Sequence, residues 1–574
     1  MVAFTSYSSV SSPPQVQDRR GWAGVVAAAA LVLSACSGKP PPEPNPAPTA
    51  ALAFAVPGRG AKVQFVEHEA ERAVYKGQLI GPDRKAKTLA GEASGRMAVT
   101  LGSDADQVEF TLVQPANAVT VRYSIPDGST GTMKVNADGA LVKELPLTSK
   151  YSWFYGGFPF TNNPADGSAH HFYDHTRALL GRDFPAGTKI ALKCVCTIDL
   201  ADFELVAAPL TRPAGSASVV DFGADPTGTR DSTEAFEAAL KAGDDVWIPP
   251  GTFKVAKHLM VGSEKLRGAG MWHSTLQGEG VGVYGKSAGV QLSDFAIIGE
   301  VTERDDKAQL NGVGGALGQS LVENLFIQHT KVGMWLDGPF DGLIVRGNRI
   351  LDTTADGLNL HQGISNTIVE HNLIRNTGDD GLAMWSDQNP NHRNAFRHNT
   401  VQLPLLANGI GIYGGHDNEI AGNVIADILI EGAGIQVANR FSGTVPLDGV
   451  TTLRDNTILR GGSRFAAISA DVGAIFLFGK DSPITGTIKL SGNTSLDSSF
   501  SGLHLYASRI ADVQVDGLTV ERPGTVGVQI QSMGAATVTR SRVAGGVYLC
   551  ADGQPFTLTA TESQGLDAPK CAGI

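Results

Sequence analysis

The chain has 574 residues, of which 69 are glycine, and a formal net charge of −11. This length exceeds one ordinary domain and predicts two or more, although a repeat domain can reach such a size by adding repeats. The negative charge excludes nucleic acid as an expected partner, because binding phosphates requires a basic surface, and it argues mildly against a polyanionic substrate.

The first 36 residues have the pattern of an export signal. Arg19 and Arg20 precede an apolar run at residues 22–33, and Cys36 ends the sequence Leu-Ser-Ala-Cys. This arrangement resembles a bacterial lipoprotein signal, in which the cysteine carries the lipid. The run is shorter than the about 20 residues of a membrane span. We therefore expect an exported protein, lipid-anchored to the bacterial cell envelope or cell surface; a plain secretory signal is the alternative.

Two segments of different composition follow. Residues 37–57 are rich in proline and predict a stiff linker. Residues 58–212 contain alternating apolar strands between Gly, Asp and Asn turns, for example at 107–113 and 118–124, and this pattern is typical of a β-sandwich.

The predicted sandwich also resembles a known module. Residues 122–128 and 150–155 are similar to carbohydrate-binding modules of family 35. The resemblance implies that exposed aromatic residues such as Trp153 and Tyr155 stack on sugar rings. A packing domain that never binds sugar is the open alternative.

Asparagine marks a repeat in residues 213–574. It recurs in a similar local setting, and the first four intervals are 24, 24, 27 and 24 residues. The positions are Asn324, Asn348, Asn372, Asn399, Asn423, Asn456 and Asn493. Such a period, with short apolar strands and glycine turns, predicts a parallel β-helix in which each coil stacks on the next. A leucine-rich repeat, the structural competitor, would show a denser leucine pattern.

The start of this repeat has a motif of its own. Residues 219–236 and 246–253 resemble the beginning of right-handed β-helices of the pectate-lyase type. Residues 231–240 predict a short amphipathic helix, with Asp231 or Ser232 as its N-cap, that covers the open end of the core. The expected fold is therefore all-β: a β-sandwich followed by a right-handed parallel β-helix that forms the catalytic domain.

Three aspartates gather at one turn of successive coils. Asp356 and Asp380 each follow a repeat asparagine by 8 residues, so they occupy equivalent positions on neighbouring coils. Stacked strands lie roughly 4.8 Å apart, and Asp379 is adjacent in sequence, so we expect three neighbouring carboxylates. The competing interpretation is a set of solvated turn residues or a calcium site.

The sequences around these acids carry a second resemblance. Residues 355–361 and 375–385 resemble glycoside hydrolase family 87, the α-1,3-glucanases and mycodextranases. The resemblance implies an inverting glycoside hydrolase that cleaves α-1,3-glucosidic linkages in α-glucan. We expect endo action, and exo action is the alternative that the sequence leaves open. It also implies that Asp356, Asp379 and Asp380 are the catalytic residues.

Inversion at a glycosidic bond has a simple chemical requirement. One protonated carboxyl serves the leaving group and one carboxylate activates water across a gap of about 6.5 to 9.5 Å. Crowded like charges raise the pKa of at least one carboxyl, which supplies the acid. We expect Asp379 to be the general acid, with Asp356 and Asp380 orienting and deprotonating the water.

Further residues are predicted to bind substrate. Two aromatic side chains are candidate sugar platforms, and an amide and two imidazoles are candidate partners of sugar hydroxyls. One glutamate follows a repeat asparagine by 8 residues, as Asp356 and Asp380 do, and this spacing, the acid register, makes it a candidate subsite residue. These residues are Asn359, His361, Trp385, Tyr413, His416 and Glu431.

The remaining cysteines differ in expectation. Cys550 and Cys571 flank the C-terminal segment and are expected to form a disulfide in an exported chain. Cys194 and Cys196 are one residue apart, and their state is left open by the sequence.

No cofactor and no catalytic metal are expected, and calcium in the β-sandwich is an open alternative. The expected partner is an α-glucan polysaccharide, with membrane contact only through the lipid on Cys36, and the chain is expected to be a monomer. Three competing functions remain: a mycodextranase acting on nigeran, a polygalacturonase or pectate-lyase-like enzyme with Arg375 as the base, and a noncatalytic glycan-binding surface protein.

Overall fold

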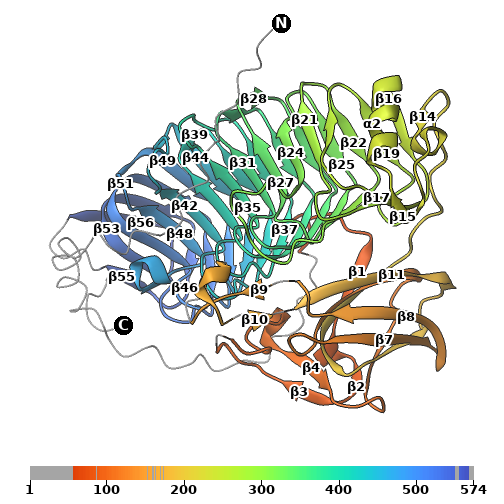
Figure 1. Cartoon of the computed structure of the whole chain (residues 1–574). Coiled ribbons are helices and arrows are strands. Elements are labelled where there is room, and N and C mark those ends of the chain that lie inside the picture. Colours follow the sequence, from red (N-terminus) through yellow and green to blue (C-terminus); the bar gives the residue numbers. More distant parts are fainter. Residues whose placement is uncertain are drawn as a thin grey trace, which may run out of the picture.

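The computed structural model describes residues 56–567, apart from residues 86, 152, 158–160, 162, 169, 172 and 550–554. A long parallel β-helix lies against a smaller antiparallel domain (Figure 1). Cys36, Cys550, Cys571 and most of the predicted linker lie outside the described residues. Within the described ranges, no helix is both long and apolar enough to cross a membrane.

Two antiparallel sheets form the N-terminal domain and enclose a core of their own. The first sheet contains β1 (Phe65–Glu69), β3 (Gln78–Ile80), β4 (Ala98–Leu101), β6 (Ala116–Ser124), β11 (Asp174–Phe184) and β13 (Cys196–Glu204). The second contains β2 (Val74–Lys76), β5 (Gln107–Thr111), β7 (Thr130–Ala137), β8 (Ala140–Thr148) and β12 (Lys189–Lys193). The predicted β-sandwich is confirmed.

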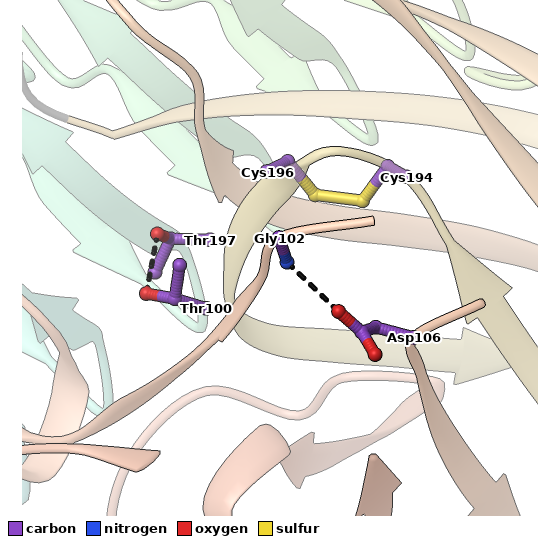
Figure 2. The surroundings of a disulfide bond; sticks show 6 residues. All are labelled: Thr100, Gly102, Asp106, Cys194, Cys196 and Thr197. Carbon is purple, nitrogen blue, oxygen red and sulfur yellow. Dashed lines mark hydrogen bonds between the residues drawn. A yellow bond between two sulfur atoms is a disulfide. The ribbon is translucent and has the colours of Figure 1, made fainter. Parts of the chain in front are cut away.

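The two cysteines of this domain are paired. Cys194 and Cys196 form a disulfide at the turn from β12 to β13, as Figure 2 shows. Both residues are buried beside the sandwich core. The pair is therefore structural in this state and offers no free thiol to a metal ion.

The coils of the β-helix contribute parallel strands to three rows, and near the C-terminal end the long strand β51 (Leu503–Asp516) runs through two of these rows. The site face contains β27 (Val332–Asp337), β31 (Leu358–His361), β35 (Leu382–Trp385), β38 (Ile410–Tyr413), β42 (Ile435–Asn439) and β48 (Ile475–Gly479). The interface face contains β26 (Phe326–Gln328), β30 (Arg349–Thr353), β34 (Leu373–Thr377), β37 (Thr400–Gln402) and β41 (Val424–Ala426). The third face contains β29 (Ile344–Arg346), β33 (Ile368–Glu370), β36 (Ala395–Arg397) and β40 (Glu419–Ala421).

One helix closes the first end of this stack. Helix α2 (Thr233–Ala242) covers the core where the coils begin (Figure 1). Ser232 is its N-cap, and Phe236 and Ala239 are fully buried. Of the two predicted N-cap residues the structure therefore selects Ser232, while the Asp231 carboxylate accepts a hydrogen bond from the Thr233 N–H.

A ladder of buried asparagines explains the repeat. Each side chain donates to the side-chain oxygen of the next, for example from Asn348 to Asn372 at 2.9 Å and from Asn372 to Asn399 at 3.0 Å. The ladder consists of Asn348, Asn372, Asn399, Asn423, Asn456 and Asn493. Asn324 was wrongly included, because Leu325 holds the ladder position and donates its N–H to Asn348.

Buried ion pairs join the sandwich to the interface face. Arg375, which is completely buried, donates to Asp202 at 2.8 Å and to Glu67 at 2.7 Å. Arg349 donates to both carboxylate oxygens of Glu204, at 2.6 and 2.8 Å. Arg375 is thus enclosed between the domains, which corrects its interpretation as a lyase base.

Candidate active site

The three aspartates lie at the turn that leads from the interface face to the site face. Asp356 precedes β31, and Asp379 and Asp380 precede β35 on the next coil. One carboxylate oxygen of each lies within 4.8 Å of one from the others. The stacking is close because the turns contain glycine: a Cβ at Gly357 would meet the Gly381 carbonyl oxygen at 2.4 Å. The sequence register therefore brings the acids together.

Asp380 is held by donors on both oxygens. Its Oδ1 accepts from the Asn408 backbone N–H and from Asn408 Nδ2, each at 2.8 Å. Its Oδ2 accepts from the Tyr413 hydroxyl at 2.6 Å. Burial, and then the charge of Asp379, raise the pKa of Asp380 to about 6 against the effect of these hydrogen bonds. Asp380 therefore changes its protonation state in mildly acidic solution.

Asp356 is the carboxyl that retains a proton most readily. Its Oδ2 accepts from Asn359 Nδ2 at 3.0 Å. Burial raises its pKa well above the ordinary value, and the neighbouring charges of Asp379 and Asp380 raise it further. One proton on Asp356 lowers the repulsion within the cluster.

Asp379 is the most accessible of the three, with 31% of its side chain exposed. Its Oδ2 accepts from Arg304 Nη1 at 2.8 Å, and its Oδ1 accepts from the Asp380 N–H at 3.0 Å. Arg304 lies in the segment between β23 (Ala296–Ile298) and β24 (Asn311–Ala316). Sequence reasoning missed Arg304 because it lies outside the repeat. It missed Asn408, which takes the position of Asp380 on the next coil, because Asn408 follows its repeat asparagine by 9 residues instead of 8.

The cluster is tighter than the chemistry led us to expect. A separated acid and base would stand about 6.5 to 9.5 Å apart, whereas oxygens of all three carboxyls approach within 4.8 Å. At such distances the pKa values of Asp356 and Asp380 depend on each other and on the charge of Asp379. A calcium site is disfavoured, because Arg304 already supplies a cation and Asp380 already has donors on both oxygens.

The predicted aromatic platforms are covered. Trp385 is 5% exposed, lies beside the His361 and Phe441 rings, and donates its Nε1–H to the Thr444 hydroxyl at 3.0 Å. Tyr413 is also 5% exposed, and its hydroxyl is bound to Asp380. Neither ring presents an open face in this structure. The Tyr413 hydroxyl instead donates a hydrogen bond to the Asp380 carboxylate.

The predicted histidines differ in position. His361 lies on the site face, with Nδ1 2.7 Å from Asp337 Oδ1 and its ring between Trp335 and Trp385. His416 lies past the end of β38, opposite to the end where the acids stand, and its Nδ1 is 2.9 Å from Asp417. The expectation that His416 lies near the acids is wrong, because its strand runs away from their turn.

The strand pairing places Asn408 and then Ala433 at the position of Asp380 on the next two coils. The expectation that Glu431 shares the position of Asp356 and Asp380 is therefore wrong. It lies in the turn before β42, two coils beyond Asp380. Burial raises its pKa to about 7, and Asp379 contributes to this increase while Arg440 and Arg464 oppose it.

In the sandwich, Tyr155 is 5% exposed rather than free to stack on sugar, and the side chain of Trp153 lies outside the described residues.

Replacing Tyr413 by phenylalanine tests the support of Asp380. The hydroxyl favours the charged carboxylate, so its loss should raise the pKa of Asp380 above about 6. We expect the acid limb of kcat/KM to move to higher pH, with activity falling about tenfold at pH 5 and less at pH 7. The measurement is the pH profile, with Tyr506→Phe as the control on the same face. An unmoved acid limb would contradict this assignment.

The architecture and chemistry together define a class of protein. A parallel β-helix with a tight cluster of carboxyl groups at a turn has the acid and base that cleavage of a glycosidic bond requires. Two family models match the chain, α-1,3-glucanase catalytic domain D1 over residues 62–206 and catalytic domain D2 over residues 230–538. The chain therefore belongs to the α-1,3-glucanase family of glycoside hydrolases, family 87, as its sequence predicted.

Solved structures agree with this membership. The catalytic unit of the thermostable GH87 α-1,3-glucanase from Streptomyces thermodiastaticus strain HF3-3 is 41% identical, with a TM-score of 0.84, and the match covers 89% of this chain and 98% of that one. A GH87 α-1,3-glucanase catalytic domain in complex with nigerose is 25% identical, with a TM-score of 0.79, covering 88% and 100%. The predicted fold is confirmed, and the sandwich fits a binding-module-like domain.

A more distant likeness involves part of the chain. The preneck appendage protein of Bacillus phage PZA is 26% identical over 224 residues, which are 36% of this chain and 25% of that protein. The chain thus spans about a quarter of the length of this curated relative.

Proposed function

We propose that the protein hydrolyses α-1,3-glucosidic linkages in α-glucan by endo action with inversion. The observation that carries this proposal is the cluster of Asp356, Asp379 and Asp380 in a family 87 chain. Three GH87 α-1,3-glucanase structures carry aspartate-to-alanine substitutions at residue numbers separated by the same intervals as these aspartates. Those structures contain nigerose or tetrasaccharides, which supports an α-glucan substrate.

The roles follow from exposure and hydrogen bonding. Asp379 is the carboxyl that an arriving sugar can reach, so it donates a proton to the leaving glycosidic oxygen as the C–O bond breaks. Water attacks the anomeric carbon from the opposite side, and its proton passes to the Asp356–Asp380 pair. The cluster gives one proton to the leaving oxygen and takes one from water, so it still holds a single proton when the products leave. These steps use carboxyl groups and water and require no cofactor.

The proposal extends to the location of the enzyme. The Leu-Ser-Ala-Cys sequence that ends at Cys36 and the proline-rich residues 37–57 support an exported, lipid-anchored chain, with the sandwich and the β-helix held away from the membrane. We infer that it works as a monomer on a polysaccharide outside the cytoplasm. Calcium in the sandwich stays a prediction.

Product analysis tests the activity. The mature protein would be incubated in parallel with insoluble α-1,3-glucan, nigeran and polygalacturonate. Nigero-oligosaccharides of mixed length from the first substrate support endo action, and NMR of the first products gives the anomeric configuration. Release from nigeran alone would make the enzyme a mycodextranase. No release from any of the three would favour a noncatalytic glycan-binding protein.

A further inference from the structure

Arg304 reaches the carboxyl cluster from outside the repeat. Its Nη1 donates to Asp379 at 2.8 Å, and its Nε donates to Asp306 at 2.6 Å. Only 12% of the Arg304 side chain is exposed. The two carboxylates raise the pKa of the guanidinium despite burial, so Arg304 is a fixed positive charge at the edge of the cluster.

The segment that carries Arg304 is tied to the acid turn. Lys331 Nζ donates to the backbone carbonyl oxygens of Asp306 at 3.3 Å and of Ala308 at 2.5 Å. The Lys331 carbonyl oxygen in turn accepts from the Ala355 N–H at 2.8 Å, one residue before Asp356. Lys331 is 7% exposed. The guanidinium is therefore positioned by the coil next to the acids and is held in place before substrate arrives.

Asp379 consequently differs from its two neighbours. Asp356 and Asp380 are bound only by uncharged donors among the described residues, whereas Asp379 has a cation in contact. A cation in contact stabilises the charged form of a carboxyl, and this form cannot donate a proton to a leaving group. The proton of the resting cluster is thus kept away from the carboxyl that must deliver it.

We propose that Arg304 is a positioning residue that keeps Asp379 ionised in the free enzyme and holds the shared proton on Asp356 until glucan separates Arg304 from Asp379. The inference rests on the proposed function. Sugar that reaches Asp379 displaces the guanidinium and excludes water from the carboxylate, and the proton then moves from the Asp356 carboxyl to the Asp379 carboxylate. No atom is gained or lost in this step, since the proton leaves one oxygen and joins another within the cluster.

Other charges face the same groups and enter the argument. They are Asp305, Asp306, Lys331, Glu431 and Arg440. Arg304 is in direct contact with the Asp379 carboxylate. Lys331 donates its side-chain hydrogen bonds to backbone oxygens. Among the described residues, it forms no hydrogen bond with the three acids. Arg304 is therefore the cation that contacts the cluster directly, through Asp379.

The test is the pH profile of kcat/KM for Arg304→Gln and Arg304→Lys. Loss of the cation lets the cluster bind protons more readily, so both limbs of the Arg304→Gln profile should move to higher pH by about 1 to 2 units. Arg304→Lys keeps the charge and should restore the wild-type limbs. Lys307→Gln removes a charge from an exposed position of the same segment and is the matched control.

Two outcomes would overturn the inference. In one, Arg304→Gln lowers kcat while both limbs stay in place, which would show a structural role alone. In the other, the lysine variant shifts as far as the glutamine variant, which would exclude charge as the cause. Far-ultraviolet circular dichroism checks that each variant is folded. If the wild type releases no product from α-1,3-glucan, the proposed function itself fails, and this result is distinct from an unmoved profile.

Discussion

Asp379→Asn should lower kcat on α-1,3-glucan by about 10²- to 10⁴-fold and leave the fold intact. Asparagine has the shape of the carboxyl but carries no acidic proton, so the leaving oxygen departs without protonation. Arg304 keeps a hydrogen-bond acceptor at this position, which limits the structural effect of the substitution. The loss should be largest for a sugar leaving group, which needs a proton, and smaller for an α-glucosyl fluoride, which does not.

The measurement compares kcat on the two substrates for wild type and variant. Asp481→Asn, at an exposed turn position of the β-helix, is the matched control and should retain wild-type rates. Equal losses on both substrates would show that Asp379 acts on water or on binding. The acid role would then pass to Asp356, whose pKa burial raises well above its ordinary value. Full activity on both substrates would remove Asp379 from the mechanism.

The repeat allowed the core of the site to be predicted. A coil that stacks at a constant interval fixes which residues become neighbours, so the equal distance of Asp356 and Asp380 from Asn348 and Asn372 was enough to place them side by side. Asn324 shows the limit of this reasoning. A single displaced asparagine kept the interval but occupied the position next to the ladder, and only the hydrogen bond from Leu325 to Asn348 reveals it.

Residues outside the repeat could not be placed in the same way. Arg304 belongs to an irregular segment between strands, and no periodicity relates its number to that of Asp379. The burial of Trp385 depends on Phe441 and Thr444, which come from a later excursion. Sequence patterns identify which face a residue occupies, but they do not show which loop covers that face.

The position of the sandwich was equally hidden. Alternating strands predicted a separate domain, and nothing in them indicated that its first sheet would cover β30 and β34 of the β-helix. Arg375 was a candidate lyase base because it lies a few residues before the acids in the sequence. Its burial against Asp202 and Glu67 makes it part of the domain interface, and the match of the sandwich to a catalytic domain model agrees with such a joined unit.

Arg375→Met should destabilise the protein strongly and in a pH-dependent manner. The substitution preserves much of the side-chain volume but leaves Glu67 and Asp202 buried without their cation, and breaking a buried pair in this way costs about 3 to 5 kcal/mol. Burial already raises the pKa of Glu67 to about 7, although Arg375 opposes that shift, so losing the arginine should raise this pKa further.

The sign of the pH effect follows from this shift. A carboxyl whose pKa is higher in the folded state binds a proton more tightly there, so the folded variant is favoured at low pH and loses this advantage as pH rises through the folded pKa. The variant should therefore lose more stability at pH 8 than at pH 5, measured by thermal unfolding of both proteins. Arg346→Met removes the exposed pair with Glu323 and should change stability by less than about 1 kcal/mol. Two results would show that the interface does not depend on this buried charge: equal losses for the two substitutions, or a loss for Arg375→Met that is independent of pH. The sandwich would then be joined to the catalytic β-helix by its other contacts.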